Sequence, residues 1–138
     1  MTNREVVIGF FKAIDHNDLV TAKKLLGSRH RIYSTMSPEP ADADQHLAIS
    51  KSFYESFSEG DHELVDILED GNKVIARAVW HGVHTGTFNG IEPTGKKVKL
   101  SFITICEIEN EEILNQWVEM DALSLMMQIG AMAGAEHA

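Results

Sequence analysis

The sequence contains little cysteine, little proline and no long apolar segment. Its 138 residues include one cysteine, which can form neither an internal disulfide nor, by itself, a structural zinc site. Ten glycines and three prolines are too few for a low-complexity or fibrous chain. No hydrophobic run is long enough to span a bilayer, and the first residues lack the pattern of a signal peptide. We therefore expect a cytoplasmic protein with no membrane partner.

Positive charge is also scarce. The chain has 12 lysines and arginines against 21 aspartates and glutamates, a formal net charge of −9. Binding to nucleic acid depends on clustered lysine and arginine facing phosphates, so we expect no nucleic-acid partner. Apolar residues make up 43% of the chain and charged residues 24%, as in ordinary globular proteins. The length predicts a single domain over residues 1–138 with a substantial core.

The hydrophobic pattern changes its period half-way along the chain. Before Gly60, apolar residues recur at helical spacing in segments that begin near Thr2, Asp18 and Gln45. After Gly60 they alternate, as in strands with one buried face. The predicted strands cover residues 31–34, 62–68, 73–84, 97–108 and 113–120. A short, nearly all-round apolar helix follows over residues 123–129. Helices followed by an antiparallel meander predict an α+β fold, whose curved sheet would leave a small-molecule pocket.

Three short motifs in the second half of the chain are similar to those of a known family. They read Gly82-Val83-His84-Thr85-Gly86, then Gly90-Ile91-Glu92-Pro93-Thr94-Gly95-Lys96, then Trp117-Val118-Glu119-Met120-Asp121 ahead of Gln128-Ile129-Gly130. In order and spacing they resemble the SnoaL-like polyketide cyclases, a branch of the NTF2-like superfamily. The resemblance implies a cone-shaped barrel in which a strongly curved antiparallel sheet and N-terminal helices enclose a pocket.

The resemblance also implies an activity and two catalytic residues. It implies a cofactor-independent enzyme that closes a ring in a polyketide ester by an intramolecular aldol reaction. Asp121 would move the proton, and a carboxylate among apolar side chains is a better proton acceptor. His84 would donate a hydrogen bond to the oxyanion. Taken from the residues alone, Asp121 is better explained as a helix N-cap, and a lone histidine on a strand is more often structural.

The residues expected to bind substrate lie on two predicted strands and at the start of the last motif. The even-numbered side of residues 74–84 carries small residues and then Trp80 and His84, so we expect this side to face the pocket. Trp80, Phe102 and Trp117 would be flat walls for a ring system, although each tryptophan is equally suited to ordinary core. Thr104 is the one well-placed hydroxyl. Cys106 has no basic neighbour, and we expect an inert buried thiol.

Two features that suggest metal or phosphate binding are better explained by structure. His81 and His84 are three residues apart, so on a regular strand they face opposite sides and cannot hold one metal. The spacing from Gly90 to Lys96 matches most of a phosphate-binding loop, but Lys97 stands where the hydroxyl ligand to magnesium should be. Pro93 also removes one backbone N–H from that loop. We therefore predict a hairpin here, and expect neither a metal nor a cofactor.

The expected partners are a small apolar or polyketide-like ligand and further copies of the same chain. The resemblance implies a homo-oligomer, a dimer or a tetramer, paired through the outer face of the sheet. That face would include Lys97, Lys99, Ser101, Ile103 and Ile105.

Other functions on the same fold remain open at this point. One is an isomerase or hydrolase acting on another apolar substrate. The other is a non-catalytic module for ligand binding or dimerisation. A pocket containing both Asp121 and His84 favours an enzyme. An interior filled by Trp80, Phe102 and Trp117, with Asp121 outside, favours the module.

Overall fold

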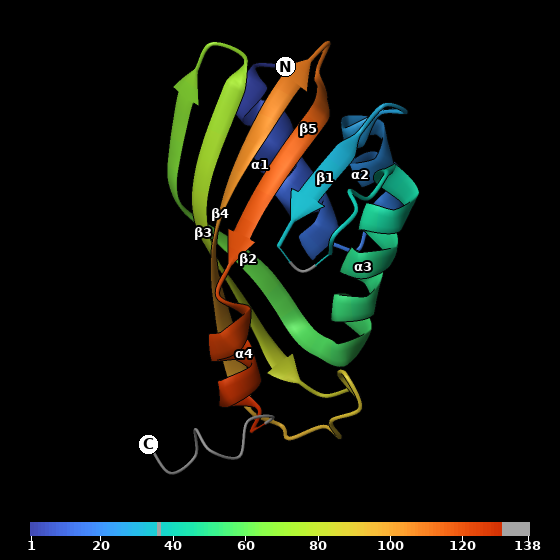
Figure 1. Ribbon diagram of the computed structural model, residues 1–138, viewed down its shortest axis with the longest axis vertical. Helices are drawn as coiled ribbons and strands as arrows, with labels where there is room; N and C mark the ends of the chain where they lie inside the picture. The colour runs from blue at the N-terminus through green and yellow to red at the C-terminus, as the bar shows by residue number, and fades with distance from the viewer. Residues whose placement is uncertain (36, 131–138) are drawn as a thin grey trace.

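The computed structural model describes residues 1–35 and 37–130, which form nine helices and strands. The elements are α1 (Asn3–Asp15), α2 (Leu19–Leu26), β1 (Arg31–Ser34), α3 (Ala43–Ser56), β2 (Phe57–Asp70), β3 (Lys73–His84), β4 (Lys97–Glu109), β5 (Glu112–Met120) and α4 (Ala122–Gln128). Figure 1 shows one strongly curved sheet with α1, α2 and α3 on one side of it. In this described part of the chain, no helix has the length and apolar character needed to cross a membrane.

The sheet has the strand order β1-β5-β4-β3-β2. The predicted α+β class and NTF2-like fold are confirmed, and the meander from β2 to β5 is antiparallel throughout. Two details differ from the antiparallel barrel that the resemblance implies. β1 pairs in parallel with β5, so the sheet is mixed, and β1 and β2 are the two edges of an unclosed sheet. Only a long connection allows parallel pairing, and here α3 and the whole meander separate the two partners.

Strand β2 is longer and more bent than the alternation predicted. It begins at Phe57, directly at the end of α3, and its pairing with β3 shifts register between Ser58 and Asp61 and again between Leu64 and Asp66. Such irregularities bend a strand and increase its twist. The first one includes Glu59, whose φ of 56° is left-handed. Figure 1 shows β2 running diagonally from the end of α3 to the turn that joins it to β3.

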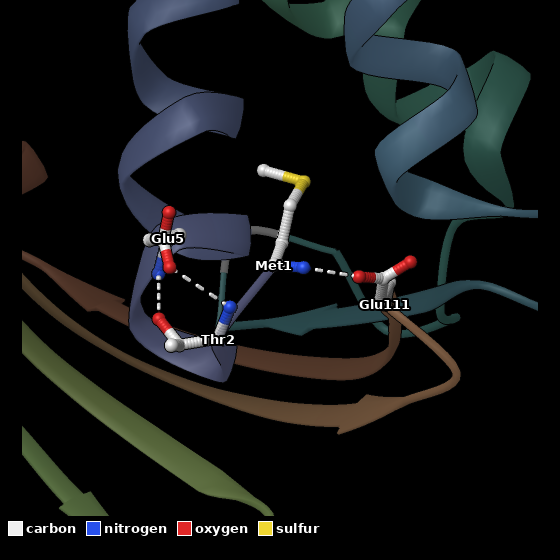
Figure 2. A network of polar contacts seen from close by, with 4 residues as sticks. All are labelled: Met1, Thr2, Glu5 and Glu111. Carbon is white, nitrogen blue, oxygen red and sulfur yellow. Dashed lines mark hydrogen bonds and ion pairs between the residues drawn. The ribbon is translucent and has the colours of Figure 1, made fainter.

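The start of α1 matches the capping pattern in the sequence. The Glu5 backbone N–H donates to the Thr2 hydroxyl at 3.1 Å, and the Thr2 N–H donates to the Glu5 carboxylate at 3.0 Å. These Thr2 contacts hold the pKa of Glu5 below its usual value. Figure 2 shows the neighbouring ion pair between the Met1 amino group and Glu111, which joins this end of α1 to the turn between β4 and β5.

The inner face of the sheet carries the core. Even-numbered residues of β3 and β4 are buried, as predicted for β3. Ala76 and Ala78 leave room on this face, and α1 packs there with five buried residues. Those residues are Val6, Val7, Phe10, Phe11 and Ala13. We call this helix-covered side of the sheet the concave face and the opposite side the convex face.

The loop after β3 is held against the end of α3. The backbone N–H groups of Thr85 and Gly86 both donate to the Ser56 carbonyl, at 3.1 and 2.9 Å. A side chain at Gly86 would meet the Glu55 carbonyl oxygen at 2.4 Å, so the close approach requires glycine. The Ser56 hydroxyl adds a bond of 2.8 Å to the Thr87 carbonyl. These contacts hold the loop against the end of α3 beside His84.

The final helix is only partly buried. Of its seven residues, Leu125 alone is buried, while Leu123 and Met127 are exposed, so the described part of the chain does not bury this apolar helix completely. Gly130 follows with a φ of 77°, the left-handed conformation in which helices commonly end.

Candidate functional site

The structure divides the predicted site residues between the two faces of the sheet. Trp80, His84, Phe102 and Thr104 are buried on the concave face. Trp117 and Asp121 lie on the other side, where their side chains are exposed. The four residues on the concave face therefore form the candidate functional site.

His84 has one ring nitrogen that is held and one that is free. Its side chain is fully buried, and Nδ1 accepts the Thr94 backbone N–H at 3.2 Å, with the Thr94 hydroxyl 3.0 Å away. Because a backbone N–H can only donate, Nδ1 is unprotonated and the proton is on Nε2. The Nε2 atom has no hydrogen-bond partner in residues 1–35 and 37–130. A buried, unused N–H donor is the result.

Aromatic side chains surround this histidine. The Phe57 ring lies 5.3 Å from the His84 ring, 5.1 Å from Trp80 and 5.1 Å from Phe88, and Phe53 packs on the same rings. We call Phe53, Phe57, Trp80 and Phe88 the aromatic cluster. A polar donor left unpaired in apolar surroundings costs about 1–3 kcal/mol. A ligand that brings a carbonyl or enolate oxygen to His84 Nε2 recovers that energy.

Thr104 is buried but its hydroxyl is already in use. It donates to the Trp117 carbonyl at 2.9 Å and accepts the Gln116 side-chain N–H at 3.1 Å. No hydroxyl proton is left for a ligand. The unpartnered atom here is the buried Oε1 of Gln116, a residue that the sequence analysis did not single out. Gln116 pairs with Cys106, near the far end of β3 from His84.

Trp117 does not line the concave face. Its side chain is 37% exposed on the convex face and stacks on Tyr33 with ring centroids 5.7 Å apart. The Lys73 ammonium group lies 5.8 Å from the indole ring. The pairing of β4 with β5 shifts register between Glu107 and Ile108, and the shift decides which residues of β5 face outward.

Asp121 is exposed and serves as the N-cap of α4. Its carboxylate accepts the Ser124 backbone N–H at 3.1 Å, and its own N–H donates to the Ser101 carbonyl at 3.0 Å. It lines a shallow hollow of about 370 Å³ together with Arg77, Ser101 and Glu119. The structure therefore does not bring Asp121 and His84 together. Arg77, which also lines this hollow, forms an ion pair with Asp66 at 2.6 Å.

The family model of the SnoaL-like polyketide cyclases matches residues 5–129. The chain belongs to the SnoaL-like polyketide cyclase family. Its fold is similar to that of IdmH from Streptomyces antibioticus, described as a candidate polyketide cyclase. The identity is 22%, the match covers 94% of this chain and 99% of IdmH, and the TM-score is 0.86. No curated protein matches the sequence.

Two further solved structures share the fold of this SnoaL-like chain. One is AclR from Streptomyces galilaeus, described as a candidate hydroxylase, at 17% identity, with 94% of this chain and 96% of AclR covered and a TM-score of 0.86. The other is a candidate SnoaL-like polyketide cyclase from Jannaschia sp. CCS1, at 20% identity, with 94% and 92% covered and a TM-score of 0.83. At these identities the similarity shows the fold alone. The descriptions of the two proteins also name different activities, a hydroxylase and a polyketide cyclase.

Sequence reasoning missed two histidine pairs in this SnoaL-like domain. His62 on β2 pairs with Asp15 at the end of α1, and His30 pairs with His46 on α3. His30 Nδ1 donates to the Ile113 carbonyl at 2.7 Å, so its Nε2 accepts from His46 Nδ1 at 3.0 Å. No sequence spacing could show these contacts, because they join separate elements. Burial raises the pKa of Cys106 to about 12, in line with the inert thiol that was expected.

The His30–His46 pair predicts that the folded state loses stability in acid. Burial lowers the pKa of His46 to about 3 in the folded protein. In the unfolded chain the pKa of this histidine is about 6.5. Between these values the unfolded state binds more protons, so the free energy of unfolding falls with decreasing pH. His46 contributes a slope of up to about 1.4 kcal/mol per pH unit. Urea unfolding from neutral pH down to about pH 4 measures it.

H46Q is the matched variant for this measurement. Glutamine can donate an amide N–H toward His30 but does not titrate. We expect a shallower slope in H46Q, with some slope left because burial also lowers the pKa of His30. Equal slopes in the two proteins would show that His46 is not the group responsible.

Proposed function

We propose that this protein is an enzyme that closes a ring in a polyketide-type ester without a cofactor. The observation that carries the proposal is the buried, unpartnered Nε2–H of His84 inside the aromatic cluster. Flat conjugated rings suit the aromatic walls, and an N–H donor suits a carbonyl or enolate oxygen. Membership of the SnoaL-like family supports the substrate class.

The proposed reaction is an intramolecular aldol addition. A base takes a proton from a carbon next to a carbonyl group, and the electron pair of the C–H bond forms the enolate. The enolate carbon then attacks a second carbonyl of the same molecule, which forms one C–C bond and an alkoxide. The alkoxide takes up a proton, so substrate and product have the same mass. His84 stabilises the developing oxyanion without rearrangement, because Thr94 fixes its tautomer.

Substitution of His84 tests this proposal. His84→Phe keeps a ring of similar size but removes the donor, and His84→Gln keeps one side-chain N–H. With a panel of linear poly-β-keto esters, we expect ring closure to fall about 10²- to 10³-fold in H84F and less in H84Q. Mass spectrometry coupled to chromatography follows the new isomer. Full turnover in a folded H84F protein would contradict the role of His84.

Asp121 is the acid/base residue that the family resemblance implies. Asp121→Asn separates this role from the observed cap, because Asn can still accept the Ser124 N–H and should lower the free energy of unfolding by no more than about 1 kcal/mol. Asn cannot take up a proton at neutral pH. Retained stability with turnover lowered about 10²- to 10⁴-fold would support proton transfer by Asp121. Retained turnover would leave Asp121 as a cap and move the base elsewhere.

A non-catalytic ligand-binding module is the second candidate. The observation that favours it is the position of Asp121 on the convex face, while Trp80 and Phe102 fill the concave face. Native mass spectrometry of the purified protein would identify a co-purified ligand. A ligand recovered unchanged after incubation, together with no ring closure on any ester, would favour the module.

We also propose that a second copy of the chain covers the convex face. Ile103, Ile105 and Trp117 are exposed there, and the family resemblance implies pairing through this face. I103D places a charge in the middle of the patch and should shift sedimentation from the mass of two chains to that of one. V20D, at an exposed apolar position of α2 away from the sheet, is the control. A single-chain mass for the unaltered protein would contradict the pairing.

A further inference from the structure

Asp15 and His62 form a carboxylate–histidine pair that the proposed ring closure does not yet use. The His62 Nδ1 atom lies 2.5 Å from Asp15 Oδ1, and the His62 backbone N–H donates to Asp15 Oδ2 at 2.9 Å. Both side chains are largely buried, 13% and 14% exposed. Asp15 is the last residue of α1 and His62 lies in the bent part of β2, so the pair also joins the helix to the sheet.

The carboxylate fixes which nitrogen of His62 is free. An ionised carboxylate only accepts hydrogen bonds, so His62 Nδ1 carries the proton and donates it to Asp15. In the neutral ring, Nε2 then keeps its lone pair. The side-chain hydrogen bond described for His62 uses Nδ1 and does not involve Nε2. The ring contacts Phe11, with centroids 4.9 Å apart, and Phe102, with centroids 5.8 Å apart. This arrangement, a base oriented by a third group in apolar surroundings, is the one that general-base histidines use.

His62 and His84 face the same side of two neighbouring strands. His62 is the register partner of Trp80, and His84 is four residues further along β3. Four residues of a strand span about 13 Å, with Trp80 at one end of that span. The two histidines also differ in tautomer, because His84 presents an N–H at Nε2 and His62 presents a lone pair. One offers a hydrogen-bond donor and the other a proton acceptor.

We propose that His62, oriented by Asp15, is a general base that takes a proton from a carbon acid bound on the concave face. The substrate class is a flat apolar molecule with a hydrogen on the carbon next to a carbonyl group. His62 Nε2 takes that hydrogen as a proton, the C–H electron pair becomes the enolate, and the imidazolium later returns the proton to the product alkoxide. The inference rests on the proposed function in placing the substrate on this face. Asp15 is a positioning residue, since its contact is with His62.

The same strands carry a matched control on the convex face. His81 Nε2 lies 3.2 Å from Glu63 Oε1, and these residues are direct neighbours of Trp80 and His62 in sequence. Their side chains are 45% and 62% exposed, so this pair is a surface histidine–carboxylate contact. This pair therefore lies on the opposite face of the sheet from the proposed base. H81Q therefore removes an imidazole from the same strand pair without touching the proposed base.

The probe is 5-nitrobenzisoxazole, a flat apolar carbon acid. A base takes its carbon-3 proton, the C–H electron pair forms the nitrile, the ring N–O bond breaks and a coloured nitrophenolate is released. We expect the protein to release the phenolate faster than an equal concentration of imidazole does. H62Q should lower that rate by about 10² and H81Q should leave it unchanged. Equal rates in H62Q and the unaltered protein, or a rate no higher than that of imidazole, would overturn the proposal.

Asp15→Asn tests the positioning role without removing the imidazole. An asparagine whose Oδ1 accepts the His62 backbone N–H turns its amide N–H₂ toward Nδ1, which moves the ring proton to Nε2. Nitrogen-15 NMR of the histidine rings should show a protonated Nδ1 in the unaltered protein and a protonated Nε2 in D15N, with probe turnover lowered. If D15N keeps the original tautomer and rate, Asp15 is only a tether between α1 and β2. This variant also decides the question if H62Q fails to fold.

The two proposals fail in different ways. Ring closure of the poly-β-keto esters that persists in H62Q but is lost in H84F overturns the base assignment and leaves the proposed function standing. Probe turnover that depends on His62, together with no ring closure on any ester, upholds the base and removes the proposed reaction.

Discussion

The bend of β2 determines which polar groups face the interior. Without its two register shifts, strict alternation would place either Phe57 or His62 on the convex face, because their numbers have opposite parity. The first shift allows Phe57 to pack on His84 and His62 to meet Asp15 and Phe102. The second returns Ile67 to the core side. The positions of both histidines on the concave face thus depend on two local irregularities in one strand.

The buried histidines share one electrostatic condition. His30, His46 and His84 are buried, so a charged imidazole at any of these positions would lose its hydration. The ring hydrogen bonds described for them go to a backbone group, a hydroxyl or another imidazole and not to a carboxylate. Each is oriented instead by backbone groups or by another neutral ring. His62 differs, because Asp15 can stabilise the imidazolium that proton uptake would create. That difference is the physical reason for placing the base at His62 and a hydrogen-bond donor at His84.

The sequence predicted local features well and the pairing of distant elements poorly. The capping box at Thr2 and the alternation of β3 depend on neighbouring residues, and both are present in the structure. The parallel contact of β1 with β5 joins residues far apart in the chain, and no local pattern encodes it. For the site, the alternation correctly placed His84 on the inner face. Which residues of β5 face outward depends on a register shift between β4 and β5, and no residue type in the sequence indicates that shift. The Asp15–His62 contact joins residues 47 positions apart, so no local pattern could predict it either.

The link between Thr94 and His84 has a consequence for how this protein can change. Thr94 lies in an exposed loop, yet its backbone N–H sets the tautomer of a fully buried ring. Loops tolerate substitution and insertion far better than cores do. Variation in residues 92–94, which are exposed, can therefore alter the chemistry offered by a buried side chain while Gly86, Phe88 and the packed interior stay the same. A laboratory library confined to those three residues would sample new settings of the His84 ring at little risk to folding.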